Sequence, residues 1–271
     1  MKRNLFITTI CCLLLITCKT PSRLYTSESE KELIRQLDSI LKEGNLLYKY
    51  EKSAWIASDL ALKNPIIEAE YNGYFTYEED GVIKVIILGT AHQTSIAEYI
   101  FENNFQIPKS VKIEKRELSD REKMLIYIRK KILENIQSNR YEITVPEGYG
   151  LNLVLLPFEN KYKLYIITGA TKPNVIPFGN DYIFIADQNG NIESWQKTPP
   201  RFRTLPEGMR VTEITRTHLT DDPLITATDI CTFMLYAPLH GLEAFSVLCR
   251  TGLRLRYSLK ENTITIGNIF R

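Results

Sequence analysis

The stretch Leu253-Arg254-Leu255-Arg256-Tyr257-Ser258-Leu259 alternates large apolar side chains with charged or polar ones. Successive side chains of a strand point to opposite faces, so this alternation is typical of an antiparallel sheet with one buried and one solvated face. Residues 244–249 before it and 263–266 after it are also expected to be strands. The C-terminal part of the chain therefore predicts an antiparallel sheet.

Strands are also predicted farther upstream, where β-branched and aromatic residues gather between turn sequences. Residues 69–77 and 82–88 are separated by Glu78-Glu79-Asp80-Gly81 and predict a hairpin. Further strands are expected at 151–156, 163–168, 182–186 and 191–196.

The segment between the last two of these strands resembles the opening of a calcium-binding loop, with Asp187, Asn189 and Asn191 at alternate positions. Such a loop also needs Gly at its sixth position and an acidic residue at its twelfth, and this segment has neither. Asn189-Gly190 instead predicts a hairpin turn.

Two helices are predicted near the N-terminus. Residues 29–32, Ser-Glu-Lys-Glu, form a capping box, and apolar residues at helical spacing continue to Gly44-Asn45. A second amphipathic run covers residues 46–63 and ends before Pro65. Because Gly and Asn commonly end helices, we expect a helical hairpin that turns at residues 44–45.

Two more helices are predicted later in the chain. Residues 119–138 begin with a second capping box and should bury Ile128 and Ile132 against the sheet that ends in strands 244–249 and 253–259. A short helix is expected to begin near Thr226 or Thr228 and to end before Pro238. The predicted fold class is α+β, a largely antiparallel sheet with an N-terminal helical hairpin and helices packed on the sheet.

The first 17 residues have the parts of a signal peptide. Lys2 and Arg3 precede an apolar run from Leu5 to Ile16. This run is about 12 residues long, whereas a membrane-spanning helix needs roughly 20. We therefore expect residues 1–17 to be a cleaved signal peptide.

The block Leu15-Ile16-Thr17-Cys18 resembles the lipobox of bacterial lipoprotein signal peptides. The resemblance implies that Cys18 carries the lipid and becomes the new N-terminus, although Thr17 departs from the small residue usual before that Cys. Residues 18–27 would then be the lipidated Cys and a tether, and residues 28–271 a single globular domain that could divide near residue 140. The implied location is the cell envelope, at the outer membrane, on its periplasmic or its outer face.

Three alternatives to this anchor stay open. The leader could be an ordinary cleaved secretory signal, the lipid could be attached to Cys11 or Cys12, or the apolar run could be a helix of a cytosolic protein.

The composition is that of an ordinary globular protein, with 24% charged and 44% hydrophobic residues. The formal net charge of +2 gives no electrostatic support for binding nucleic acid. Downstream of residue 18 the cysteines are Cys231 and Cys249, which an oxidising compartment would allow to pair. Their spacing matches no redox or metal motif, which favours two buried thiols.

Common catalytic signatures are absent from the sequence. It contains no Gly-x-Ser-x-Gly, Walker or Gly-x-Gly-x-x-Gly motif, which argues against an α/β-hydrolase, a P-loop NTPase and a nicotinamide enzyme. Any histidine-based site must use His92, His218 or His240, and we interpret His92 and His240 as loop residues.

His218, Thr226 and Asp229 stand at the spacing His-x7-Ser/Thr-x2-Asp. This pattern resembles the C-terminal part of the JAB/MPN metalloprotease family, whose members cut isopeptide or peptide bonds with zinc. The resemblance implies that His218 and Asp229 are zinc ligands and that Thr226 holds the hydroxyl position. The family's first His position is Arg216 here, and no upstream Glu can be assigned.

The same residues also fit a helix N-terminus, where Thr226 or Thr228 would cap the helix and the helix dipole would favour Asp229. A guanidinium has no lone pair for a metal, so we expect Arg216 to pair with Asp229 and to form a salt-bridged structural corner. This interpretation needs no zinc and no other cofactor.

Two functions follow from the sequence. The first is an envelope lipoprotein with a non-enzymatic binding or scaffolding role, attached to the membrane through lipid on Cys18. Residues 52–55, 179–182 and 225–229 resemble blocks of uncharacterised envelope lipoproteins of Gram-negative bacteria, which implies location and no activity. The second function is a degenerate or unusual JAB/MPN-like zinc hydrolase built around His218.

Overall fold

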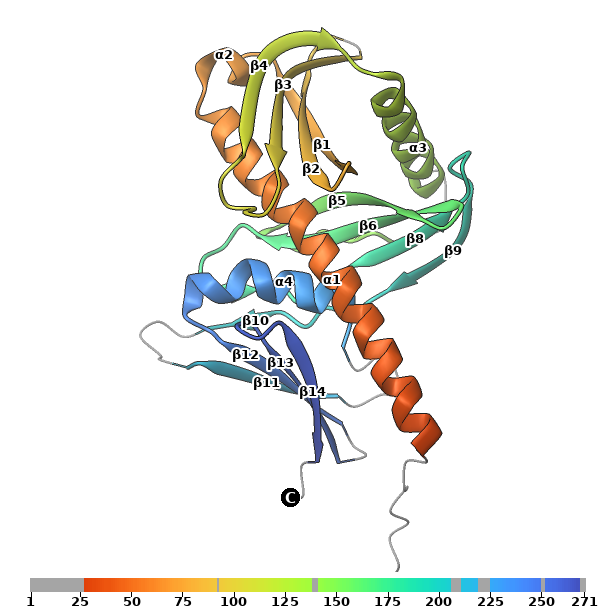
Figure 1. The fold of residues 1–271 in the computed structure, drawn as a ribbon, viewed down its shortest axis with the longest axis vertical. Helices are drawn as coiled ribbons and strands as arrows, with labels where there is room; N and C mark the ends of the chain where they lie inside the picture. The colour runs from red at the N-terminus through yellow and green to blue at the C-terminus, as the bar shows by residue number, and fades with distance from the viewer. Residues whose placement is uncertain are drawn as a thin grey trace, which may run out of the picture.

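The protein has the predicted α+β class, with antiparallel sheets, a long N-terminal helix and further helices packed on the sheets (Figure 1). A computed structural model describes residues 27–91, 93–137, 141–205, 211–218, 225–249 and 252–268. Some predictions lie outside these residues. They are the signal peptide 1–17, the lipidation of Cys18, the tether as far as residue 26 and the loop position of His92.

The N-terminal segment is one helix, α1 (Ser27–Leu62), of 36 residues. The predicted helical hairpin with a turn at residues 44–45 is therefore wrong. At 1.5 Å per residue α1 is about 54 Å long. It runs diagonally along the molecule and contacts strands of all three large sheets (Figure 1).

Gly44 serves a helix contact instead of a turn. It lies where α1 packs on α4 (Ala227–Tyr236), and a Cβ at residue 44 would lie 2.6 Å from Ile230 Cβ. Asn45 stays helical, with Nδ2 donating to Leu41 O at 2.7 Å and Oδ1 accepting from Asn262 Nδ2 at 2.9 Å. The two residues that suggest a helix end thus hold α1 to distant parts of the chain.

The first sheet follows a one-turn helix, α2 (Pro65–Glu68), and has the order β1-β2-β3-β4 with antiparallel pairing. The predicted hairpin is β1 (Tyr71–Glu79) and β2 (Val82–Gly89). Its turn residues Asp80 and Gly81 both have positive φ, as a two-residue hairpin turn requires. Strands β3 (Thr94–Phe101) and β4 (Ser110–Glu117) were not predicted.

Helix α3 (Asp120–Gln137) confirms the predicted element but packs elsewhere than expected. Ser119 caps it, since Glu122 N donates to Ser119 Oγ and Ser119 N donates to the Glu122 carboxylate. Its buried Ile128 and Ile132 share a core with the first and second sheets, whereas strands 244–249 and 253–258 belong to another core. The predicted contact with those C-terminal strands is therefore wrong.

The second sheet has the order β5-β6-β8-β9 and contains strands β5 (Tyr149–Phe158), β6 (Lys161–Ala170), β8 (Tyr182–Ala186) and β9 (Ile192–Lys197). The turn before β9 is the predicted hairpin turn, because the Asp187 carboxylate accepts from the backbone N–H groups of Asn189 and Asn191. A two-stranded ribbon joins β7 (Val175–Ile176) and β10 (Arg203–Thr204).

The third sheet has the order β11-β12-β13-β14 and contains the stretch that alternates apolar and polar residues. Strands β12 (Ala244–Cys249), β13 (Leu253–Ser258) and β14 (Thr263–Asn268) pair antiparallel, as predicted. Strand β11 (Glu213–His218) pairs parallel to β12. A parallel pair needs a long crossover, and α4 followed by the short helix η1 (Ala237–His240) lies within it.

Candidate functional site

The corner around Asp229 is the site that the sequence suggested. Thr226 is the N-cap of α4, with its Oγ1 accepting from Asp229 N at 3.1 Å. The Asp229 carboxylate in turn accepts from Thr226 N at 3.0 Å. Both residues are buried, and their spacing is that of a helix capping box.

Two arginines share the Asp229 carboxylate. Arg216 Nη2 lies 2.9 Å from Oδ2, so the predicted pair of Arg216 and Asp229 is confirmed. Arg201 Nη2 lies 3.0 Å from Oδ1 and was not predicted as a partner. The Asp229 side chain has no exposed surface, and its oxygens accept from two guanidinium groups and one backbone N–H. A zinc ion could use this carboxylate only by displacing them.

A second buried carboxyl group lies close to this corner. Asp181 Oδ1 accepts from Thr168 N at 3.0 Å, whereas Oδ2 has no hydrogen-bond partner among the described residues. Burial raises the pKa of Asp181 to about 7. Burial also lowers the pKa of Arg216, although Asp229 opposes that shift. The corner is thus a buried polar network whose described contacts fit a structural role.

The other sequence candidates are His218, His240 and the two downstream cysteines. His218 is the last residue of β11, in register with Cys249, and its side chain lies outside the description. His240 ends η1. Cys231 and Cys249 are buried and unpaired, as the sequence favoured. Among the described residues no group of three His, Cys, Asp or Glu side chains is placed to hold a metal.

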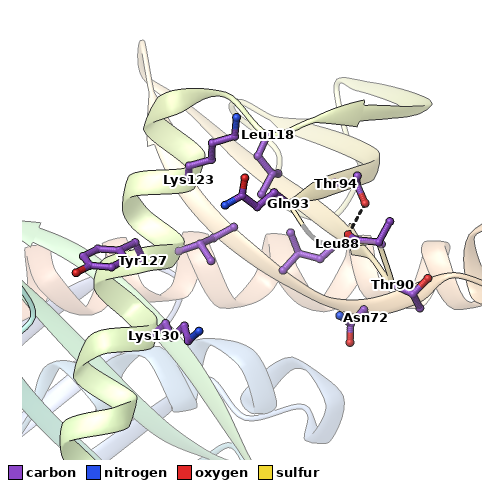
Figure 2. A pocket seen from close by; sticks show the side chains of 12 residues that line it. Asn72, Leu88, Thr90, Gln93, Thr94, Leu118, Lys123, Tyr127 and Lys130 are labelled. Carbon is purple, nitrogen blue, oxygen red and sulfur yellow. Dashed lines mark hydrogen bonds between the residues drawn. The ribbon is translucent and has the colours of Figure 1, made fainter.

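One surface cleft lies between α3 and the first sheet, with a volume of 320 Å³ (Figure 2). Lys123, Tyr127 and Lys130 of α3 lie across it from Leu88 and Thr94 (Figure 2). Thr94 Oγ1 donates to Ala91 O at 2.7 Å and thereby fastens the turn beside the cleft. None of its described lining residues has a buried polar atom that lacks a partner.

A different cleft, here called the Glu51 cleft, forms where α1, β1, β5, β6 and α4 meet. Its volume is 340 Å³, at the lower end of the range of ligand pockets. Its walls carry four aromatic rings, those of Trp55, Tyr71, Tyr74 and Tyr236. Trp55 and Tyr236 contact each other with ring centroids 6.0 Å apart, and Tyr236 Oη accepts from Ala170 N at 2.9 Å. The rings of Trp55 and Tyr236 are therefore held in place by these contacts.

Glu51 is the buried carboxyl group of this cleft. It is 4% exposed, and its Oε1 has no hydrogen-bond partner among the described residues. Burial raises its pKa from 4.5 to about 7, and a hydrogen bond from the Asn152 side chain partly opposes that shift. A charged carboxylate at this depth is costly unless a ligand or a proton neutralises it.

The cleft floor is open at Gly150, which faces Gly169 across β5 and β6. The space at Gly169 is taken up, since a Cβ there would lie 3.2 Å from Asn152 Nδ2 and 3.6 Å from Tyr236 Oη. Gly150 pairs with Gly169, and directly opposed residues of antiparallel strands share one face of the sheet. A Cβ at residue 150 would meet no atom within 4 Å, so packing does not require Gly there. Neither glycine has a positive φ. Glycine in a strand often marks a close approach by a ligand or another backbone.

The Glu51 cleft combines aromatic rings, an open floor and a buried acid. No protein-family model, curated protein or solved structure matched the chain in comparisons. The function of the chain is therefore inferred from the chemistry of its own residues.

Sequence reasoning missed both Glu51 and Arg201. Glu51 stands four residues after Leu47 and three before Ala54, so it falls on the buried stripe of α1. An acidic residue on an apolar stripe is a signal that could have singled it out. Arg201 lies in an irregular segment, and no local pattern ties it to Asp229.

Proposed function

We propose that this chain is an envelope lipoprotein, anchored through lipid on Cys18, whose domain binds a small ligand in the Glu51 cleft without chemically changing it. The observation that carries the binding role is the open space at Gly150 beside Glu51, a buried acid whose Oε1 has no hydrogen-bond partner among the described residues. A strand with a side chain at Gly150 would be stronger, so this glycine is best explained by the space it leaves.

The anchor rests on the N-terminal sequence, where the apolar run ends in Leu-Ile-Thr-Cys18. Within the described ranges, none of the helices has the length and the apolar character that crossing a membrane needs. A lipid on Cys18 contributes about 0.8 kcal/mol per buried CH₂, so several acyl chains would hold the domain at a membrane surface.

The geometry of Asp229 favours the binding role over the zinc hydrolase. Two arginines and a backbone N–H occupy the carboxylate that a zinc ion would need. Elemental analysis of the purified domain should therefore find no stoichiometric zinc. About one zinc per chain, lost in His218→Ala, would support the hydrolase instead.

The binding role is tested by filling the cleft. Gly150→Phe places a ring in the open space. Gly267→Phe is the matched control, because Gly267 lies in strand β14 and a Cβ there would lie 4.0 Å from Arg254 O. Ligand-observed NMR with a library of small polar and aromatic fragments should give hits on the wild type and on Gly267→Phe that Gly150→Phe loses. An identical set of hits on all three proteins would refute a ligand site in this cleft.

The anchor is tested separately on the full chain. Intact mass of membrane-extracted protein should show a chain that begins at Cys18 and carries acyl groups, and Cys18→Ser should move the protein out of the membrane fraction. An unmodified N-terminus at another residue would refute the anchor and leave the cleft untouched.

A further inference from the structure

The charged side chains that line the Glu51 cleft are acidic. Among its described lining residues these are Glu51 and Asp59, and no Lys, Arg or His lines it. Two cations that do not line the cleft contact residues that do. Lys52 Nζ lies 5.2 Å from the Trp55 ring centroid, and Arg129 Nη1 donates to Tyr74 O at 3.0 Å. The cleft itself thus offers a ligand negative charge and hydrogen-bond acceptors.

We infer that the Glu51 cleft selects a small organic cation, an ammonium group on a short aliphatic body, over a neutral molecule of the same shape. This inference rests on the proposed binding role and names the class of ligand. The carboxylate of Glu51 supplies the counter-charge, since Glu51 lines the cleft and its buried Oε1 has no hydrogen-bond partner among the described residues.

The aromatic rings favour the same class. A cation within about 6 Å of a ring centroid is attracted by the negative face of the ring, most strongly for Trp. The chain itself shows this contact, since the Lys52 ammonium lies over Trp55. Trp55, Tyr71, Tyr74 and Tyr236 bring four such rings to one cleft. A charged head can therefore lose its water and still be stabilised there.

The size of the cleft limits the ligand. A volume of 340 Å³ equals about eleven water molecules at their share of liquid volume, which suits a compact amine. Gly150 leaves the floor open for the aliphatic body of the amine.

The test compares two molecules of one shape. Choline carries a positive charge, and 3,3-dimethylbutan-1-ol is its neutral isostere; n-butylamine adds a primary ammonium group. Each is titrated at pH 8 into labelled protein while the indole N–H signals are followed. The chain has two Trp residues, so Trp55 reports on the cleft and Trp195, outside its lining, is the internal control.

We expect at least one of the two ammonium ions to shift the Trp55 signal and to bind at least about tenfold more tightly than the alcohol. Glu51→Gln should lower that affinity about tenfold or more, and Trp55→Leu, followed by calorimetry, about three- to thirtyfold. Asp38→Asn removes the same charge from an exposed site on α1 and should change the affinity less than twofold.

The cation inference would be overturned if neither ammonium ion bound more tightly than the alcohol, or if the preference for the ammonium ion survived Glu51→Gln. Failure of both ammonium ions to bind, while library fragments still bind in a Gly150-dependent way, would also overturn it and leave the binding role intact. If Gly150→Phe leaves every fragment hit unchanged, the binding role itself is refuted.

Discussion

Replacing Glu51 with Gln should make the protein more stable at pH 8 and leave its stability nearly unchanged at pH 4. In the folded chain burial raises the pKa of Glu51 from 4.5 to about 7. The unfolded chain therefore releases this proton at a lower pH than the folded chain does. Between these two values the folded state binds more protons, so the stability falls as the pH rises through this window.

The magnitude follows from the size of the shift. About 2.5 pKa units at 1.36 kcal/mol each give about 3 kcal/mol of destabilisation by pH 8. Gln has the same shape and no charge, so Glu51→Gln should recover this amount at pH 8 and almost none at pH 4. Wild-type stability alone cannot isolate the effect, because burial also raises the pKa of Asp181 to about 7.

The assay is urea unfolding at a series of pH values from 4 to 8, with the wild type and Glu51→Gln measured side by side. Asp38→Asn is the exposed control on the same helix and should follow the wild type at every pH. A difference between wild type and Glu51→Gln that stays constant from pH 4 to pH 8 would refute the burial of an ionisable Glu51.

Three further substitutions test the packing. Ile132→Ala empties a fully buried position in α3 and should lower the free energy of unfolding by about 2 to 5 kcal/mol, whereas an unchanged urea midpoint would mean that the helix packs differently. Gly44→Ala puts a methyl group 2.6 Å from Ile230 Cβ and should cost about 1 to 3 kcal/mol in the same assay; a gain in stability would contradict the contact of α1 with α4. Asp229→Asn leaves two arginines without their carboxylate and should cost about 3 to 5 kcal/mol, and a loss in melting temperature of under one degree would show that the corner is not structural.

Local patterns were enough to find most of the elements. The capping box at Ser119 and the alternation at 253–259 are set by neighbours in the sequence, and both elements form where they were predicted. The exposed strand β4 has no buried face to give it a pattern, so it was missed. Gly44-Asn45 was misjudged because the residues that explain it, Ile230 and Asn262, lie far along the chain.

The candidate site depended even more on tertiary contacts. The pair of Arg216 and Asp229 was predictable, because both residues stand at ligand positions of the JAB/MPN-like pattern and carry opposite charges. Glu51 carried a local signal, a charge on the apolar stripe of α1. The floor of its cleft comes from Gly150 and Gly169 of the second sheet, and no spacing in the sequence relates these residues to α1.

The most direct test of an anchored, ligand-binding lipoprotein is native mass spectrometry of the full chain extracted from membranes in a mild detergent. We expect a chain that begins at Cys18, carries acyl groups, and holds a small cationic molecule that the Gly150→Phe variant lacks. A chain with an unmodified N-terminus, or a small molecule that Gly150→Phe retains equally, would contradict this expectation.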